Sequence, residues 1–325
     1  MSNLQTNYLG LSLRNPLIVS SSGLTSTREK ITRLEASGAG AVVLKSVFEE
    51  QILNETTHLE NYTAYTEAAD YLQFYLKEDY LGQYLNMIRD LKSTLSIPVI
   101  ASICCVAPGG WVDFARRIEE AGADALELNV FLLPTRRDET AAAIEQRYLS
   151  IVEAVTSAVK LPVAVKVTSR FTNLLNVVEG IAHRNARGVV MFNRFYEPDI
   201  NIRSLEVTEA DIFSSSAELR NSIRWIAMAS AAFPQLDIAA STGVHTGEDA
   251  AKVLLAGAKV FEVCSMVYRG GLETIGKITS FLESWMQEQG FESMQEVVGK
   301  LNYSRVSSPI AYERAQFMKY FASHE

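Results

Sequence analysis

Residues 236–271, LDIAASTGVHTGEDAAKVLLAGAKVFEVCSMVYRGG, contain two consecutive strand-to-turn units separated by a helix, and this pattern decides the fold. The apolar run 236–241 predicts a buried strand, followed by a tight turn at Gly243, which tolerates a positive φ. The helix that follows ends at Gly257, the residue type that most often terminates helices. Residues 260–263 predict the next strand, so the stretch indicates neighbouring parallel strands joined by a helix.

The turns after these two strands consist of small residues whose backbone N–H groups can hold a phosphate. In a (β/α)8 barrel, phosphate usually binds at the turns after strands 7 and 8. Two ordinary turns without a ligand are the alternative interpretation. The residues concerned are Thr242, Gly243, Val244, Cys264 and Ser265.

Six further apolar segments precede this stretch and lack polar alternation, which is typical of strands buried on both faces of a parallel sheet. Helical segments lie between them, so the chain alternates strand and helix. Eight such units favour a closed α/β barrel, the (β/α)8 TIM barrel, over an open sheet. The expected strands are 17–22, 41–46, 98–103, 124–129, 162–168, 188–193, 236–241 and 258–263, and the expected helices include 27–37, 111–121, 141–159, 216–232 and 272–289.

We expect one domain that covers residues 1–325. A short N-terminal hairpin at 7–16 precedes the barrel at about 17–289, and a helical C-terminal extension, 290–325, follows it.

Two connections, 47–80 and 194–214, are longer than simple turns. Long connections in compact domains are usually lids or binding loops, and we expect that role for both.

The composition of the 325 residues, 48% hydrophobic and 21% charged with a net charge of −8, indicates an ordinary globular protein and argues against a nucleic-acid surface. The three cysteines imply no disulfide framework and lack metal-site spacing, so we expect a reducing, cytoplasmic environment and no metal. The N-terminus does not resemble a signal peptide. Prolines and glycines interrupt the uncharged run 93–112, so we expect no membrane span.

Several expected strands end in a charged or amide residue, although buried parallel strands should be apolar. In a barrel these ends share one rim, from which active-site groups come. A lysine between valines, as at Lys166, points toward the barrel centre and needs a paired charge or a lowered pKa. The alternative for any one lysine is a surface residue with its head in water. The rim residues are Lys45, Ser46, Asn129, Lys166, Asn193 and Arg194.

Taken in order, six short segments resemble the FMN-binding barrel of class 1 dihydroorotate dehydrogenases over about residues 5–285. They are LIVSSSG at 17–23, VVLKS at 42–46, ELN at 127–129, VAVKV at 163–167, FN at 192–193 and TG at 242–243.

The resemblance implies that FMN lies across the barrel mouth. Its phosphate would be held by 242–244 and by Cys264 and Ser265, while Ser21, Ser22 and Gly23 would lie beside the flavin ring.

By the same resemblance, Lys45 and Ser46 contact flavin and substrate, and Asn129 and Asn193 are the amides between them. Lys166 matches the lysine near flavin N1, where a fixed ammonium stabilises the negative charge of the reduced ring.

The chain departs from the family where a Cys or Ser base is expected, three residues after Asn129. Leu132 or Leu133 stands there, and neither accepts a proton. The nearest hydroxyl is Thr135. The family's Gly-Leu-Pro-Asn substrate loop is also absent from 47–86.

Three residues are candidates for replacement roles. Cys105 either approaches the rim as a base or is a small buried cysteine. Arg194 either grips a substrate carboxylate or pairs with Glu197 or Asp199. His245 either reaches the phosphate or caps a helix.

Three functions compete. The first is an FMN-dependent oxidoreductase that oxidises dihydroorotate or a related small molecule, with Lys45, Asn129, Lys166 and Asn193 as its catalytic residues and Arg194 as a further substrate contact. The second is a flavin-binding barrel without such turnover. The third is a Schiff-base lyase that uses Lys166 as its nucleophile. We also expect a homo-oligomer, specifically a dimer.

Overall fold

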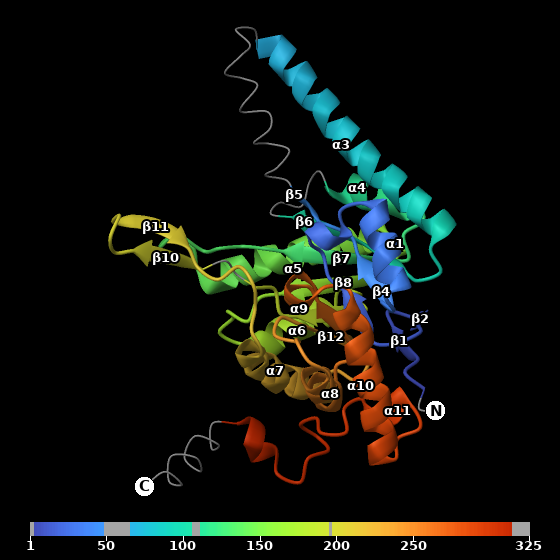
Figure 1. Ribbon diagram of the computed structural model, residues 1–325. Coiled ribbons are helices and arrows are strands. Elements are labelled where there is room, and N and C mark those ends of the chain that lie inside the picture. The colour runs from blue at the N-terminus through green and yellow to red at the C-terminus, as the bar shows by residue number, and fades with distance from the viewer. Residues whose placement is uncertain (1–2, 49–65, 106–110, 195–196, 314–325) are drawn as a thin grey trace.

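The computed structural model describes residues 3–48, 66–105, 111–194 and 197–313, with side chains throughout except at 66–79, 105 and 111. Within this part of the chain, eight parallel strands form the barrel (Figure 1). They are β3 (Leu17–Val19), β4 (Ala41–Val43), β6 (Val99–Cys105), β7 (Ala125–Val130), β8 (Val163–Val167), β9 (Gly188–Met191), β12 (Asp237–Ser241) and β13 (Val260–Val263).

The sheet closes on itself, which confirms the predicted (β/α)8 barrel. The order is β4-β3-β13-β12-β9-β8-β7-β6, and β4 pairs with β6 to complete the circle. The short β5 (Val47–Phe48) follows β4 in the sequence and also pairs with β6. Each expected strand overlaps an observed one, so the apolar runs were sufficient to locate the barrel wall.

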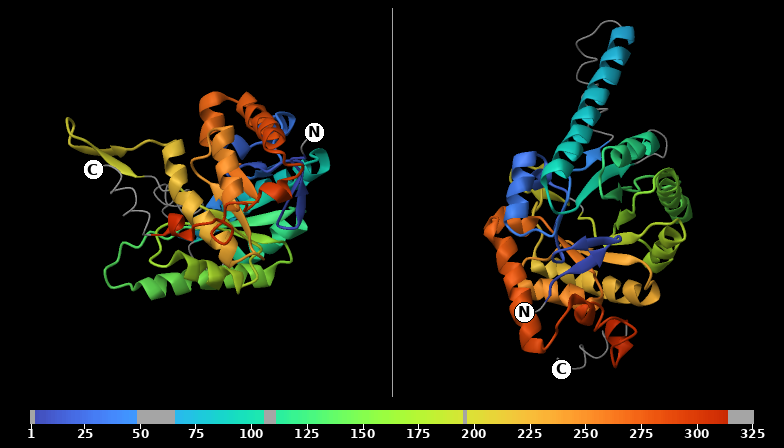
Figure 2. Two further views of the ribbon diagram at one scale, coloured as in Figure 1. Left: turned by 90° about the horizontal axis from the view of Figure 1, so that it is seen from below. Right: turned by 90° about the vertical axis from the view of Figure 1, so that its right-hand side faces the viewer.

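Helices surround the barrel, as the two views of Figure 2 show. The predicted ones are confirmed, and α7 is preceded by a single 3₁₀ turn, η2 (Ser216–Glu218). They are α1 (Arg28–Ala36), α4 (Trp111–Glu120), α5 (Ala141–Ala158), α7 (Leu219–Ala232), α8 (Gly247–Ala256) and α10 (Glu273–Gln289). Gly257 ends α8 with a φ of 125°, as expected.

The prediction of a long loop at 47–80 is wrong for its second half, because α3 (Thr66–Thr94) begins at Thr66. This helix projects from the barrel (Figure 1). Leu81, Leu85, Ile88 and Leu91, three or four residues apart, are buried and attach its C-terminal part to the barrel. Residues 49–65 lie outside the described part of the chain.

The connection 194–214 is not an irregular loop either. It contains a hairpin, β10 (Pro198–Asn201) and β11 (Glu206–Glu209), which extends to the left of the barrel in Figure 1, whereas α3 rises above it. Two shorter helices were not predicted: α6 (Leu174–Ala182), and α9 (Ser265–Gly270), which follows β13 and borders the rim cavity.

The predicted N-terminal hairpin consists of β1 (Thr6–Tyr8) and β2 (Leu11–Leu13) and closes the amino-terminal end of the barrel (Figure 2). Four of the strand residues that face the interior there are alanines, which leave space. Tyr8, Leu9 and Leu13 fill the space and pack with Ile18, Ala41, Val43, Ile100, Ala125, Ala164, Val190, Ala239 and Val260. The interior is therefore a packed floor beneath the carboxyl-terminal rim.

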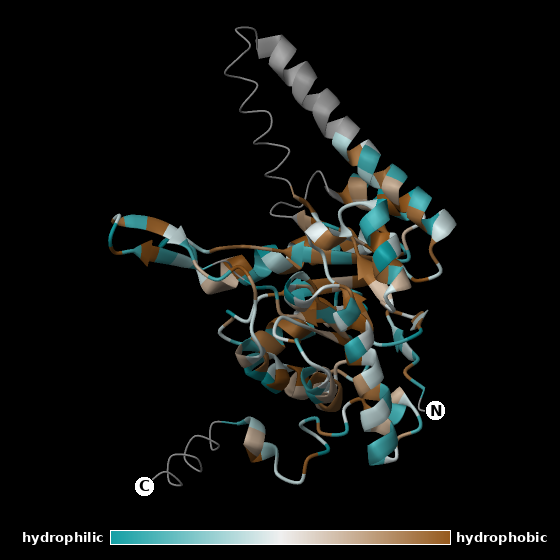
Figure 3. Ribbon diagram, viewed as in Figure 1, coloured by the Kyte–Doolittle hydropathy of each residue, from teal (hydrophilic) through white to brown (hydrophobic). Residues whose placement is uncertain are grey.

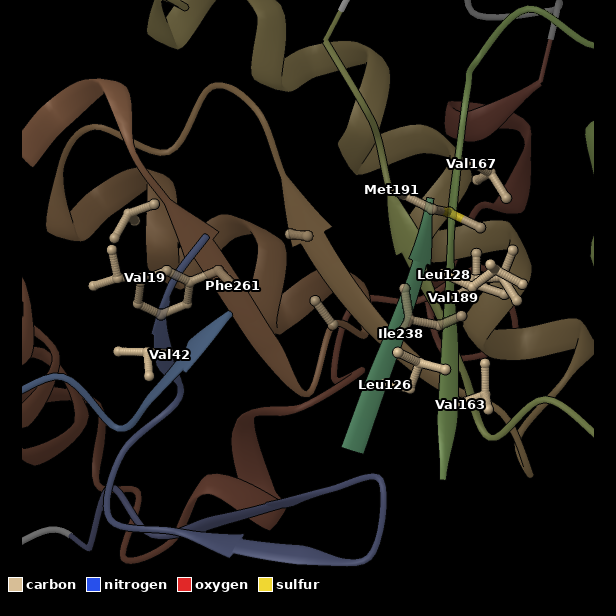
Figure 4. Close-up of a cluster of buried hydrophobic side chains, with 14 of the residues drawn as sticks. Val19, Val42, Leu126, Leu128, Val163, Val167, Val189, Met191, Ile238 and Phe261 are labelled. Atoms are coloured by element: carbon tan, nitrogen blue, oxygen red, sulfur yellow. The ribbon is translucent and has the colours of Figure 1, made fainter. Parts of the chain in front are cut away.

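The opposite faces of the strands pack against the helices and form the larger core (Figure 4). Val19, Val42, Leu126, Val163 and Phe261 are among its buried members. Strands buried on both faces explain the uninterrupted apolar runs in the sequence.

After α10, the described part of the extension contains only short helical turns, α11 (Met294–Val297) and η3 (Pro309–Tyr312). The third 3₁₀ turn, η1 (Gly23–Thr25), lies at the rim after β3. None of the described helices combines the length and the apolar character that a membrane span requires.

We predict that Leu13→Ala destabilises the protein by about 2–5 kcal/mol, because Leu13 is fully buried in the floor and its removal leaves a cavity. The free energy of unfolding in urea measures this loss. Ser12→Ala, on the same strand but exposed, should change the free energy by less than about 0.5 kcal/mol. Equal effects of the two substitutions would show that the hairpin does not plug the barrel.

Candidate active site

A cavity of about 490 Å³ opens at the carboxyl-terminal rim of the barrel. This volume lies within the range of small-molecule and cofactor sites. Every rim and turn residue singled out from the sequence lines it, although they come from seven different strand ends. They are Ser21, Ser22, Gly23, Lys45, Ser46, Asn129, Lys166, Asn193, Arg194, Thr242, Gly243, Val244, Cys264 and Ser265.

Lys166 lies at the bottom of this cavity between two carboxylates. Its Nζ donates to Glu262 Oε2 at 2.6 Å and to Glu127 Oε1 at 3.3 Å. The lysine side chain is 9% exposed, and those of Glu127 and Glu262 are 2% and 1% exposed. The buried charge is thus paired, which is one of the two outcomes expected for a lysine inside a strand.

Burial alone would lower the pKa of Lys166, but the charges and hydrogen bonds of Glu127 and Glu262 outweigh burial and hold the pKa above its usual range. Burial raises the pKa of Glu127 well above its usual range, and the negative charge of Glu262 raises it further. Lys166 is therefore a fixed ammonium group and not a neutral amine.

The two amides of the rim contact each other directly. Asn193 Nδ2 donates to Asn129 Oδ1 at 2.9 Å, and both side chains are partly exposed to the cavity. Lys45 is exposed at the same mouth, and its ammonium forms no ion pair within the described residues. The rim therefore offers hydrogen-bonding groups and a second cation above the buried one.

A chain of hydroxyls runs along the β3 and β4 side of the cavity. Ser46 Oγ lies 2.9 Å from Ser21 Oγ and 2.7 Å from Ser102 Oγ. Ser22 has a local role, because its side chain caps η1. Gly23 is closely covered, since a Cβ there would lie 2.6 Å from the Tyr268 hydroxyl.

Arg194 pairs with neither Glu197 nor Asp199, so that alternative is wrong. Its Nε lies 3.0 Å from Glu218 Oε2, and its Nη1 donates to the Ile212 carbonyl at 2.8 Å. Glu197 pairs with Arg170 instead. Arg194 therefore ties the segment before α7 to the rim while still lining the cavity.

The turn after β12 is narrow, and Gly243 takes the positive φ that the sequence predicts. Thr242 and Gly243 have φ values of 71° and 92°. A Cβ on Gly243 would lie 2.6 Å from the backbone nitrogen of Leu219, so only glycine fits against the start of α7. The turn after β13 meets the same segment, because Ser214 N donates to Ser265 Oγ at 3.0 Å.

The ring of His245 does not cap a helix. It is half-buried and contacts a serine of the segment before α7. Its Nε2 lies 2.9 Å from Ser214 Oγ, while its backbone N–H donates to Asp249 at 3.2 Å. Burial and the nearby charge of Arg269 lower the pKa of His245. The imidazole is therefore neutral at pH 7, next to the two turns that line the cavity.

These residues can be compared with known proteins. The family model described as dihydroorotate dehydrogenase matches residues 3–286. This chain belongs to the dihydroorotate dehydrogenase family.

Its curated relatives are distant but cover most of the chain. The catalytic subunit of dihydroorotate dehydrogenase B (NAD(+)) from Methanocaldococcus jannaschii is 26% identical over 91% of this chain and 97% of its own. The putative dihydroorotate dehydrogenase A (fumarate) from Aeropyrum pernix is 28% identical over 91% and 96%. The NAD-dependent dihydropyrimidine dehydrogenase subunit PreA from Escherichia coli K12 is 26% identical over 92% and 77%.

Family membership confirms the predicted resemblance and makes the chain an oxidoreductase of the dihydroorotate dehydrogenase type. The departure at the expected base remains. Leu132 packs partly buried against the core and Leu133 is largely exposed, and neither lines the cavity. Thr135 is exposed, and the side chain of Cys105 lies outside the described residues.

Two acidic residues of the cavity were not identified from the sequence. Glu127 and Glu262 precede Asn129 and Cys264 by two residues, so strand alternation points them to the same side. This two-residue spacing is the sequence signal that places both glutamates in the site.

Two aromatic residues of the cavity wall were also missed. Phe213 and Tyr268 contact each other with ring centroids 5.5 Å apart. No short motif predicts this contact, because it joins the end of a long connection to α9.

We predict that Lys166→Met costs about 3–5 kcal/mol of stability near pH 8, because it removes the ammonium to which two buried carboxylates are hydrogen-bonded. Without the ammonium, the second buried carboxylate charge of the cluster is unpaired, so the folded variant takes up one more proton than the folded wild type does. Its deficit relative to the wild type should therefore grow as pH rises above about 4, the unfolded pKa of a glutamate. Urea unfolding at pH 5 and pH 8 measures this dependence; a deficit independent of pH would contradict it.

Proposed function

We propose that this protein is a cytoplasmic FMN-dependent dehydrogenase that oxidises dihydroorotate or a related small molecule. The observation that carries the proposal is the ammonium of Lys166, fixed at the bottom of a rim cavity that also contains the amides of Asn129 and Asn193. A fixed cation of this kind stabilises negative charge that develops on a bound ring.

The chemical groups that line the cavity suit both the phosphate and the ring of FMN. The turns 242–244 and 264–265 supply small residues and backbone N–H groups for a phosphate, with the neutral imidazole of His245 beside them. The segment 21–23 and Lys166 would border the ring. Bound FMN would supply the hydride acceptor, which no side chain provides.

The remaining rim residues would orient the substrate. Asn129 and Asn193 are fixed by their mutual hydrogen bond, and Lys45 offers an exposed cation for an anionic substrate group. Arg194 keeps only part of its guanidinium free, because Glu218 and the Ile212 carbonyl hold the rest. We therefore propose Lys45 rather than Arg194 as the main cationic substrate contact.

A Schiff-base lyase is disfavoured by the same geometry. A nucleophilic lysine needs a neutral amine, usually with a lowered pKa. Lys166 is hydrogen-bonded to two carboxylates, and its pKa is raised.

A flavin-binding barrel that does not turn over dihydroorotate is the second candidate. The specific observation in its favour is that Leu132 and Leu133 occupy the position of the expected proton acceptor. This candidate shares the cofactor with the first and differs in lacking dehydrogenase turnover.

We predict that the purified protein is yellow and releases FMN on denaturation, or binds added FMN with a change in flavin absorbance. Addition of dihydroorotate with a dye acceptor then distinguishes the two candidates photometrically. Turnover supports the dehydrogenase, whereas FMN-loaded protein without turnover supports the second candidate. A protein that stays colourless in excess FMN refutes both.

We also propose that the chain forms a homodimer through the β10–β11 hairpin. Ile200 and Val207 pair across the two strands, and Ile202 and Leu205 lie in the turn that joins these strands. All four are at least 66% exposed, and the hairpin stands clear of the barrel (Figures 1 and 3). An isolated two-stranded hairpin is marginal in water, so an uncovered apolar face of this kind favours a partner. The neighbouring residues Asp199, Glu206 and Thr208 make the other face polar.

We predict that Val207→Lys converts the dimer to a monomer, because it places a charge in the proposed apolar interface. Light scattering coupled to size-exclusion chromatography measures the mass. Glu206→Lys, one residue earlier and on the polar face, is the matched control and should leave the dimer intact. A wild-type protein that is monomeric at all concentrations would exclude this interface.

A further inference from the structure

Three ionisable side chains meet inside the barrel from both sides of its interior. Glu127 lies on β7, next to β8, while Glu262 lies on β13, which β12 and β9 separate from β8. Lys166 Nζ contacts both carboxylates, so the ammonium bridges the interior. These contacts fix the cluster at the bottom of the cavity.

The formal charges of this cluster do not balance. Two ionised carboxylates and one ammonium would leave a net charge of −1 in a site almost without solvent. Burying an unpaired charge is expensive, and a carboxyl group usually takes up a proton instead.

Among the residues that the structure describes, no further cation acts on Glu127 besides Lys166. Asp237 below the cluster is itself paired with Lys259 at 2.5 Å and accepts from Leu9 N at 2.6 Å. The Tyr8 hydroxyl is buried without a hydrogen-bond partner among the described residues, and burial, Glu262 and Glu127 raise its pKa. Burial also raises the pKa of the Cys264 thiol at the cavity wall. Both groups are thus neutral.

We propose that Glu127 carries a proton at neutral pH and donates it to Glu262, so that Lys166 and Glu262 form a neutral ion pair beneath the cavity. The distances select Glu127, because Glu262 has the shorter contact to the ammonium, 2.6 Å against 3.3 Å. The direction of the Glu127 pKa and its hydrogen bond with the Glu262 side chain agree with this assignment.

Glu127 then acts as a positioning residue through Lys166. While it is protonated, only one carboxylate competes for the ammonium, and the remaining charge of Lys166 is available to an anionic or electron-rich ligand edge. When Glu127 ionises, the second carboxylate competes as well, and the ligand loses part of that attraction. This consequence rests on the proposed flavin function, whereas the proton on Glu127 does not.

The proton is tested by infrared difference spectroscopy on the full chain after any bound flavin has been removed. At its ordinary pKa of about 4.3, only about one glutamate in 500 is protonated at pH 7. We expect wild-type protein at pH 7 to absorb as a buried protonated carboxylic acid, and this absorption should disappear when pH is raised under conditions where the circular dichroism remains native. Its absence at pH 7 would overturn the proposal without any variant.

Two substitutions test whether the proton belongs to the pair Glu127 and Glu262. Glu127→Gln should abolish the protonated-acid band, because the amide replaces the neutral acid. Glu262→Gln should also abolish it, because Glu127 then ionises and pairs with Lys166. If Glu262 had only a structural role, the protonated-acid band should persist in Glu262→Gln. Glu288→Gln, on the exposed side of α10, is the control and should leave the band unchanged. A band that survives in Glu127→Gln would assign the proton elsewhere.

The consequence for the ligand is measured separately, as the dissociation constant of FMN across pH. In the wild type, FMN should bind more weakly as pH rises through the midpoint of the infrared titration. In Glu127→Gln this dependence should vanish, while affinity at pH 7 remains close to that of the wild type. An identical pH dependence in both proteins would refute the role of Glu127. Absence of FMN binding would refute the proposed cofactor and leave the infrared result intact.

Discussion

The contact of the Lys166 ammonium with Glu127 and Glu262 organises the interior of this barrel. Below it, alanines on β4, β7, β8 and β12 leave room that Tyr8, Leu9 and Leu13 of the N-terminal hairpin fill. This plug excludes water from the amino-terminal end, so the charges above it must satisfy one another. The packed floor and the paired charges are therefore two parts of one arrangement.

Above the charges, the side chains of the rim are restrained by contacts with one another. Ser46 contacts Ser21 and Ser102, Asn193 donates to Asn129, and Arg194 is held by Glu218. Groups fixed in this way need little reorganisation when a ligand binds, which is the condition under which electrostatic stabilisation is most effective. The segment that ends at Ser214 joins this network through Ser265 and His245.

The barrel and the rim positions were predictable because both follow from local patterns. Continuous apolar runs located the strands, and the polar residues at their ends all reached one cavity. The partners of these residues were not predictable in the same way. Arg194 has two acidic residues nearby in sequence, yet it pairs with Glu218, because the chain folds back through a hairpin that was expected to be a loop. Helix α3 was missed although its buried leucines repeat at helical spacing, since its polar and tyrosine-rich start suggested a loop.

The departures from the family pattern are distributed unevenly over the fold. Lys166, Asn129 and Asn193 lie on or directly after barrel strands, where neighbouring strands fix each position. Leu132 and Leu133 belong to the irregular segment after β7, and a loop can change there without disturbing the sheet. In barrels of this type the strands position the shared chemistry and the loops vary the substrate. A chain that keeps the charged centre and changes the loop therefore keeps the strand positions on which the proposed cofactor site depends, while Leu132 and Leu133 offer no group that could remove a substrate proton.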